Sequence, residues 1–162
     1  MKQILLSITL LFVGMAVFAQ NVAFSSADLD GNKITDEIFS NADVTVVNVW
    51  GTFCPPCIRE MPELAAWQKS MPKNVQIIGI VCDVTSSGDK RGVSNAKAIL
   101  KRAGATFTNI VADESLSTLL NGIQFVPTTF LVDKNGGIVG EMIVGAQVAK
   151  YKKAVEDYLA KK

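Results

Sequence analysis

The sequence contains no histidine, and this absence excludes several kinds of chemistry at once. Without imidazole there is no Ser-His or Cys-His nucleophile pair, no histidine-ligated zinc or haem site, and no histidine pH switch. An excess of positive charge is also lacking, because 16 Lys and Arg side chains oppose 15 Asp and Glu side chains. This balance does not favour nucleic acid as a partner. Any catalysis must therefore use thiols, carboxylates, amines or hydroxyls.

Long apolar runs are confined to the first residues of the chain. A polar start at residues 1–3 leads into an apolar run from Ile4 to Phe18, which is followed by the small residue Ala19. As a helix, fifteen residues reach about 22 Å, short of the roughly 30 Å hydrocarbon core of a membrane. We expect residues 1–19 to be a secretory signal peptide cleaved after Ala19. The alternative is an uncleaved signal anchor that tethers residues 20–162 to the outer face of the cytoplasmic membrane.

The remaining 20–162 segment has a length suited to one domain, without internal repeats or low-complexity segments. Polar residues with a turn signal indicate a short hairpin and connector at 21–43. β-branched and apolar runs predict strands, and apolar residues at three- and four-residue steps predict helices. The expected strands are 44–50, 75–81, 107–111, 128–132 and 138–144, and the expected helices are 55–71, about 96–103, 114–121 and 148–159. An Asn-Gly turn at 135–136 predicts that the last two strands pair antiparallel. The fold class is α/β, with a mixed sheet flanked by helices.

Two cysteines, Cys54 and Cys57, enclose two prolines where the first long strand gives way to a helix. A disulfide ring this small removes little chain entropy, so the pair suits thiol-disulfide exchange better than stapling. A sulfur at a helix N-terminus is favoured as thiolate, the attacking species, which makes Cys54 the expected nucleophile. Cys57, one turn inside the helix, is positioned to attack the mixed disulfide and release the substrate.

The residues between the cysteines bear on the redox potential. Pro55 and Pro56 have no N–H to donate to the Cys54 sulfur, so thiolate stabilisation is expected to be moderate. This favours a reductant or isomerase over a strong oxidant. A purely structural disulfide remains an alternative, whereas a zinc site would need four ligands and only Cys82 is left as a thiol. We expect Cys82 to be a core thiol, with a resolving role as the alternative.

Several spaced motifs carry a resemblance to a known family. Trp50-Gly-Thr-Phe-Cys-Pro-Pro-Cys57, Pro62 beyond the second Cys, and Val126-Pro-Thr-Thr-Phe-Leu-Val-Asp133 resemble the thioredoxin superfamily. More narrowly, the chain resembles the exported TlpA/ResA-type thiol-disulfide oxidoreductases. The resemblance implies a thioredoxin-like fold, with a central mixed β-sheet flanked by helices and an α-β insertion over 89–111.

The resemblance also assigns site residues. It implies a cis peptide bond between Val126 and Pro127 beside the disulfide, and a substrate chain that pairs with the backbone there. The substrate contacts it implies are Trp50, Pro55, Pro56, Val126 and Pro127. Glu60 stands three residues after Cys57, where many relatives carry a carboxylate, and could exchange a proton with that thiol. Thioredoxin has a buried Asp at the position that Asn48 occupies here, so proton transfer is expected to fall to Glu60.

The leading hypothesis is a disulfide reductase in the periplasm or on the outer face of the cytoplasmic membrane. It implies a monomer without a cofactor, a membrane thiol electron donor, and protein substrates with cysteine pairs. Apocytochrome c is one such substrate in the family, although this chain has no haem-attachment motif of its own. The alternatives are a disulfide oxidase or isomerase, a peroxidase, and a binding module whose disulfide stabilises a groove. The peroxidase pattern has a Thr three residues before the reactive Cys, whereas Thr52 stands only two residues before Cys54, which argues against a peroxidase.

Overall fold

The computed structural model describes residues 21–162, so the expected leader at 1–19 lies outside the described residues. Five strands form a mixed sheet in the order β5-β4-β3-β6-β7, and a separate hairpin pairs β1 with β2. The strands are β1 (Ser25–Ala27), β2 (Lys33–Thr35), β3 (Val44–Trp50), β4 (Val75–Val81), β5 (Asn109–Val111), β6 (Thr128–Asp133) and β7 (Ile138–Val144). The helices are η1 (Asp36–Asn41), α1 (Pro55–Ser70), α2 (Lys90–Ala103), η2 (Glu114–Leu116), α3 (Ser117–Leu120) and α4 (Val148–Leu159), with η1 and η2 of the 3₁₀ type.

The central strand is β3, and all seven of its residues are buried. It runs parallel to β4 on one side and antiparallel to β6 on the other. Its β-branched composition suits a strand that is covered on both faces, because such side chains pack closely against neighbours on a pleated surface. The expected mixed sheet is therefore confirmed, and its best-protected strand leads directly into the cysteine motif.

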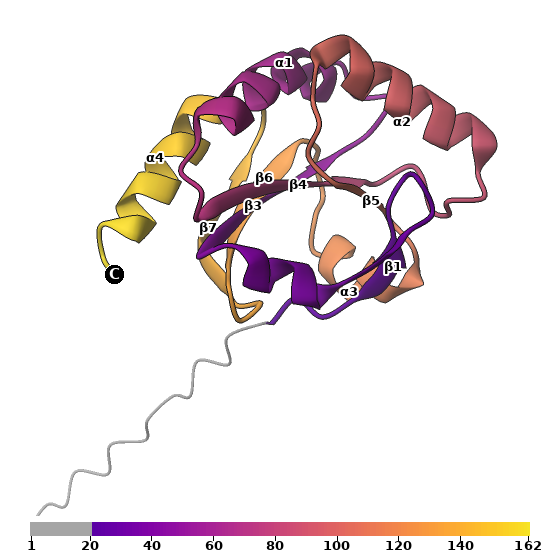
Figure 1. Ribbon diagram of the computed structural model, residues 1–162. Coiled ribbons are helices and arrows are strands. Elements are labelled where there is room, and N and C mark those ends of the chain that lie inside the picture. Colours follow the sequence, from indigo (N-terminus) through magenta and orange to yellow (C-terminus); the bar gives the residue numbers. More distant parts are fainter. Residues whose placement is uncertain (1–20) are drawn as a thin grey trace, which may run out of the picture.

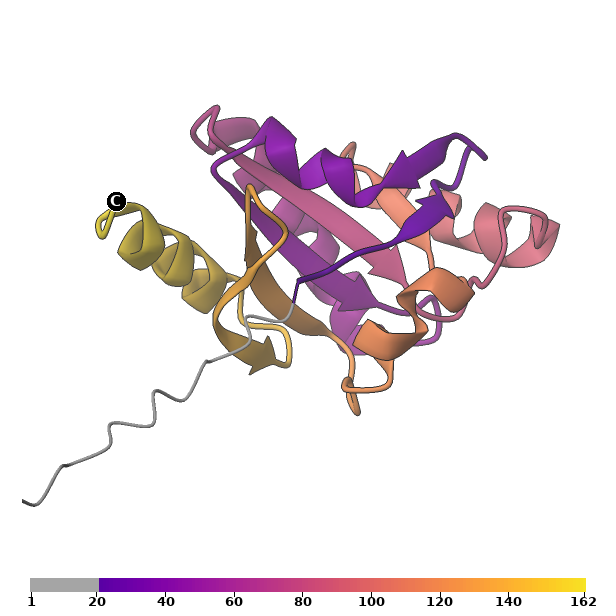
Figure 2. The same cartoon turned by 90° about the horizontal axis from the view of Figure 1, so that it is seen from below.

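Two layers of helices cover the sheet (Figure 1). Helices α1, α2 and α4 lie over one face, and their apolar side chains form one core cluster with alternate residues of β3, including Val44, Val46 and Trp50. The other face is covered by the β1–β2 hairpin, η1 and α3, which cross it in Figure 2. Val47 and Val49 point into this second cluster. Because side chains alternate along a strand, one strand contributes to both cores.

Strand β5 extends the sheet beyond β4 and is tied to the centre by a buried hydrogen bond. The Trp50 indole Nε1 donates to the Asn109 Oδ1 at 2.8 Å across the intervening β4 strand. Gly79 makes this approach possible, since a Cβ at that position would lie 1.9 Å from the Asn109 Oδ1. Helix α2 and β5 are the helix and strand expected over 89–111. Their status as an insertion relative to minimal thioredoxins stays a prediction.

The observed ends of most helices and strands agree with those expected from the sequence, and some are set by local capping contacts. Helix α2 begins at Lys90 because the Asp89 side chain accepts from the Gly92 N–H, and it ends at Gly104 in the left-handed conformation. The strand expected at 107–111 is shorter, and the helix expected at 114–121 is a 3₁₀ turn followed by one α-helical turn. Helix α1 continues through Pro62. Within residues 21–162, no helix has the length and apolarity needed to cross a bilayer.

Candidate active site

The two cysteines of the motif form a disulfide at the start of α1. The Cα atoms of Cys54 and Cys57 are 5.3 Å apart. Cys54 is the N-cap of the helix, and the Cys57 N–H donates to its sulfur at 3.3 Å. Pro55 and Pro56 occupy the first two helical positions, where a missing N–H costs the helix nothing. A sulfur at this position lies at the positive end of the helix dipole, which stabilises a thiolate after reduction.

A second loop closes over the disulfide from the start of β6. The Val126–Pro127 peptide bond is cis, as expected from the sequence. The Val126 carbonyl oxygen lies 3.4 Å from the Cys54 sulfur, and Val126 itself is half-buried. The loop is fixed on its far side, because the Gly145 N–H donates to the Pro127 carbonyl at 2.8 Å. The disulfide and the cis-proline loop thus lie side by side.

Glu60 lies one turn of α1 beyond Cys57, with a side chain that is almost fully buried. Its Oε1 accepts from the Asn48 Nδ2 at 2.9 Å, and its Oε2 lies 3.1 Å from the Tyr151 hydroxyl. Burial raises the pKa of the Glu60 carboxyl to about 7, although the hydrogen bonds that Asn48 and Tyr151 can donate to the ionised carboxylate act in the opposite direction. The nearby charge of Glu63 adds to the rise. A carboxyl with this pKa can both accept and release a proton near neutral pH.

The buried polar cluster around Glu60 joins four elements of the fold, α1, β3, β6 and α4. Asn48 on β3 also donates to the Thr129 hydroxyl on β6 at 2.9 Å, while its own Oδ1 has no hydrogen-bond partner among the described residues. Tyr151 on α4 has no exposed surface, and burial raises its pKa to about 12. From its sequence, Tyr151 is only one residue of an apolar helical stripe. The contact between its hydroxyl and Glu60 depends on the packing of α4 over α1, which the sequence pattern does not show.

The structure separates the expected substrate contacts into two groups. Pro55 is exposed, and Pro56 and Val126 are half-buried, so these three residues reach the surface, whereas Pro127 is buried. Trp50 does not belong with them, because its side chain has no exposed surface and its indole N–H is turned inward to Asn109. The expectation that Trp50 contacts a substrate is therefore corrected: it packs in the core beneath the site.

Two exposed aromatic residues flank the disulfide and were missed by sequence reasoning. Phe53 precedes Cys54, Phe125 precedes Val126, and each side chain is 67% exposed. Together with Cys82 and Leu120 they line a hollow of about 520 Å³. Two large exposed apolar side chains beside one hollow make these residues candidates for contact with a partner. Their position directly before the two motif residues is the signal that sequence reasoning could have used.

Cys82 follows β4 and is half-buried at the margin of the second core cluster. Burial, together with the charge of the neighbouring Asp83, raises the pKa of this thiol to about 11. At neutral pH it is therefore protonated and a poor nucleophile. Among residues 21–162, no group of three His, Cys, Asp or Glu side chains is arranged to hold a metal ion.

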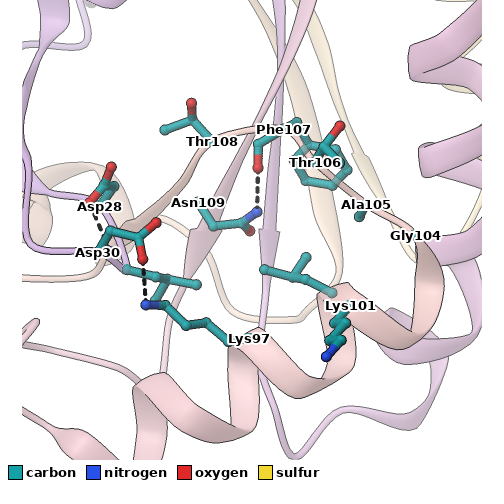
Figure 3. A pocket seen from close by; sticks show the side chains of 12 residues that line it. Asp28, Asp30, Lys97, Lys101, Gly104, Ala105, Thr106, Phe107, Thr108 and Asn109 are labelled. Atoms are coloured by element: carbon teal, nitrogen blue, oxygen red, sulfur yellow. Dashed lines mark hydrogen bonds and ion pairs between the residues drawn. The ribbon is translucent and has the colours of Figure 1, made fainter.

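A separate hollow of about 550 Å³ lies between the β1–β2 turn and the α2–β5 connection. Figure 3 shows that its wall is partly polar and that Lys97 reaches across to Asp30. These two side chains form an ion pair at 2.5 Å, and both are exposed to solvent. No cysteine lines this hollow, and its side chains offer no group for thiol exchange. The chemistry therefore belongs to the disulfide at α1.

Comparisons with known proteins identify a family and relatives named for thiol-disulfide chemistry. The Redoxin family model matches residues 13–158. A thiol-disulfide oxidoreductase ResA from Bacillus cereus is 34% identical over 139 residues, which cover 85% of this chain and 73% of that protein. A probable thiol:disulfide interchange protein DsbE-2 from Pasteurella multocida is 31% identical over 142 residues, covering 80% and 69% of the two chains.

Solved structures show the same fold. A thiol:disulfide interchange protein of the thioredoxin family from Chlorobium tepidum superposes with a TM-score of 0.64 at 26% identity, covering 78% of this chain and 86% of that one. StoA from Bacillus subtilis, at 21% identity, superposes with a TM-score of 0.62 and covers 84% and 97% of the two chains. With its Cys54–Cys57 pair, the chain belongs to the Redoxin family and is a thiol-disulfide oxidoreductase of the ResA/DsbE type.

Proposed function

We propose that this protein is a reductase of disulfides in exported proteins, working outside the cytoplasm. The observation that carries the proposal is a pair of active-site cysteines followed, one helical turn later, by a buried, protonatable carboxyl, with no second disulfide among the described residues. The signal-like leader at 1–19 supports an extracytoplasmic location. Protein substrates with cysteine pairs and a membrane thiol donor are the partners that such a cycle requires.

In the proposed cycle, the Cys54 thiolate attacks one sulfur of a substrate disulfide. A mixed disulfide forms between Cys54 and the substrate, and the other substrate sulfur leaves as a thiolate. Cys57 then loses its proton to Glu60, and the Cys57 thiolate attacks the Cys54 sulfur. The second substrate sulfur leaves as a thiolate, both substrate thiolates take up protons from water to give a dithiol, and the enzyme is left with the Cys54–Cys57 disulfide. Two electrons from the membrane thiol donor restore the reduced pair.

Glu60 is suited to this step by its position on α1. Residues three apart on a helix lie on the same face, with Cβ atoms about 5–6 Å apart, so Glu60 is a near neighbour of Cys57. A side chain with a pKa of about 7 is partly ionised at neutral pH and can take the thiol proton. We infer that Glu60 is the general base of the second step and a general acid when the disulfide is reduced again.

The substrate is proposed to bind as an extended chain along Val126 and Pro127. Backbone pairing at a loop beside the nucleophile would hold a substrate cysteine next to Cys54 without requiring a particular sequence. Pro55 and Pro56 border the same surface, and the exposed Phe53 and Phe125 rings offer apolar contact. Such a surface favours unfolded or locally extended proteins. Apocytochrome c is one protein of this kind, and cytochrome c maturation is the finer role that we propose to test.

A peroxidase fits the site less well. The Thr52 hydroxyl, which would have to lie near the cysteine sulfur in a peroxidase site, donates instead to Asp83 Oδ2 at 2.5 Å. The Thr52 N–H donates to the other oxygen of the same carboxylate at 2.9 Å. Thr52 is thereby held away from the Cys54 sulfur, which favours disulfide exchange.

The decisive measurement is the equilibrium reduction potential of the Cys54/Cys57 couple against glutathione or a dithiol buffer. The Cys82→Ser variant is the matched control, because it removes the remaining thiol and should leave the potential unchanged. A potential near the thioredoxin value of about −270 mV supports the reductase. A potential near about −120 mV, the value of a strong oxidase, would contradict it and favour an oxidase or isomerase.

Partners can be identified by trapping. The Cys57→Ala variant cannot resolve the mixed disulfide, so we expect it to accumulate substrates bound to Cys54. The Cys54→Ala variant is the control and should trap none. An unchanged set of bound proteins in Cys54→Ala would instead favour a binding module in which the disulfide only stabilises the groove.

A further inference from the structure

The Tyr151 hydroxyl makes three hydrogen-bond contacts, with the Thr129 hydroxyl as a further polar neighbour, and has only one proton to donate. The Gly145 carbonyl oxygen lies at 2.6 Å, Glu60 Oε2 at 3.1 Å, and the Gln147 N–H donates to the hydroxyl oxygen at 3.1 Å. A carbonyl oxygen can only accept, so the short contact to Gly145 requires the Tyr151 proton. The proton is then not available for Glu60.

This assignment fixes the protonation state of Glu60 that the geometry fits. With the Tyr151 proton directed at Gly145, the hydroxyl presents a lone pair to Glu60 Oε2. A hydrogen bond between these two oxygens therefore needs the carboxyl's own proton on Oε2. The other oxygen, Oε1, already accepts from Asn48, as the carbonyl oxygen of a neutral carboxyl would. When Glu60 ionises, the Tyr151 hydroxyl must turn from Gly145 to Oε2. Otherwise a lone pair of the hydroxyl oxygen would face a lone pair of the carboxylate, and the two would repel each other.

Gly145 connects the hydroxyl to the substrate loop. Its φ angle of +88° is one that glycine adopts readily, so the backbone can turn sharply between β7 and α4. Its carbonyl accepts from Tyr151, and its N–H donates to the Pro127 carbonyl at 2.8 Å. A change at the Tyr151 hydroxyl is therefore two hydrogen bonds away from the cis-proline.

We propose that Tyr151 is a positioning residue that couples the proton on Glu60 to the backbone holding Pro127. The proposal rests on the proposed function, because it takes Glu60 as the acceptor of the Cys57 proton. When that proton moves, Cys57 becomes a thiolate, Glu60 becomes neutral at Oε2, and the Tyr151 hydroxyl returns to Gly145. The loop beside the substrate is then held by its full set of hydrogen bonds while Cys57 attacks.

The groups that face Glu60 allow a clean test of this coupling. From α1 they are Cys57 and Glu63, and Glu63 also forms an ion pair with Lys152 of α4 at 3.6 Å. From α4 the facing group is Tyr151, whose pKa of about 12 keeps it neutral. Strands β3 and β6 contribute Asn48 and Thr129, and the Thr129 hydroxyl also lies near the Tyr151 oxygen. In the oxidised protein the cysteine pair does not titrate, and the chain has no histidine.

The experiment is an NMR titration of the oxidised protein between pH 5 and 9. We expect the Gly145 and Gln147 amide resonances to shift with one midpoint near 7, together with the Glu60 side-chain carboxyl resonance. In Tyr151→Phe, which keeps the buried ring, the shift of the two amides should be lost while Glu60 still titrates. Tyr158→Phe, on the same helix, is the matched control and should behave as the wild type.

The Glu60→Gln variant provides a second test of the coupling, in which Tyr151 is retained. Its amide can accept from Asn48 and donate to the Tyr151 oxygen, as neutral Glu60 does, so both amide resonances should stay constant across the range. Retention of the full amide shift in Tyr151→Phe would overturn the proposal, as would flat Gly145 and Gln147 resonances in a wild type whose Glu60 titrates. The titration needs no substrate, so it stands apart from the reduction potential that tests the reductase.

Discussion

The buried Glu60 carboxyl predicts an unusual dependence of stability on pH. Its pKa is raised from 4.5 in the unfolded chain to about 7 in the folded protein. Between these values the unfolded chain has lost the proton and the folded protein retains it, so stability falls as pH rises. The contribution is fully present below about pH 4.5 and lost above about pH 7. At 1.36 kcal/mol for each pH unit, the loss amounts to about 3 kcal/mol.

The Glu60→Gln variant isolates this contribution, because the other carboxylates of the two proteins cancel in the comparison. We expect the free energy of unfolding of the oxidised wild type, relative to that of the variant, to fall by about 3 kcal/mol between pH 4 and pH 8. Urea unfolding at several pH values, with the disulfide intact, measures the difference directly. A difference that stays constant within about 0.5 kcal/mol would refute the reasoning and show that Glu60 titrates at an ordinary carboxyl pKa in the folded protein.

Three further substitutions test other contacts. Gly79→Ala drives a methyl group against Asn109 Oδ1, and we expect a loss of about 3 kcal/mol in urea unfolding. Asp83→Ala removes both hydrogen bonds to Thr52, which should cost about 2 kcal/mol and slow disulfide reduction in a turnover assay. Asn48→Asp puts a second carboxyl beside the buried glutamate, so stability should fall by about 3 kcal/mol at pH 8 but change little at pH 4, as measured by thermal unfolding. Equal losses at both pH values would contradict the last prediction.

The fold was largely predictable because its strongest patterns are local. The bounds of β3, β4, β7 and α4 follow from runs of β-branched residues, an Asn-Gly turn and a helical apolar stripe, and each was predicted to the residue. The strand at 107–111 was overestimated, since its first two residues fit a strand pattern but only three pair with β4. Pairing between strands depends on the tertiary structure, which a local sequence pattern does not describe.

The site was predictable only where a motif names a residue. The cysteine pair and the cis-proline follow from short motifs. The burial of the Glu60 side chain does not, because a glutamate among charged residues on a helix has the pattern of a surface residue. The environment of its carboxyl is made by Asn48 and Tyr151, far apart in sequence and brought together by β3 and α4. Trp50 shows the opposite case, since the buried-strand pattern already implied that its side chain would face the core.

The central position of β3 determines the order in which parts of the molecule unfold. Hydrogen bonds on both sides and complete burial make its amides the last to exchange with solvent, whereas the three-residue β5 and the largely exposed β7 lie at the edges of the sheet. Fraying should therefore begin at the rim and reach the strand that leads to Cys54 only on global unfolding. A molecule that frays only at its edges would keep the Cys54–Cys57 pair in its folded geometry.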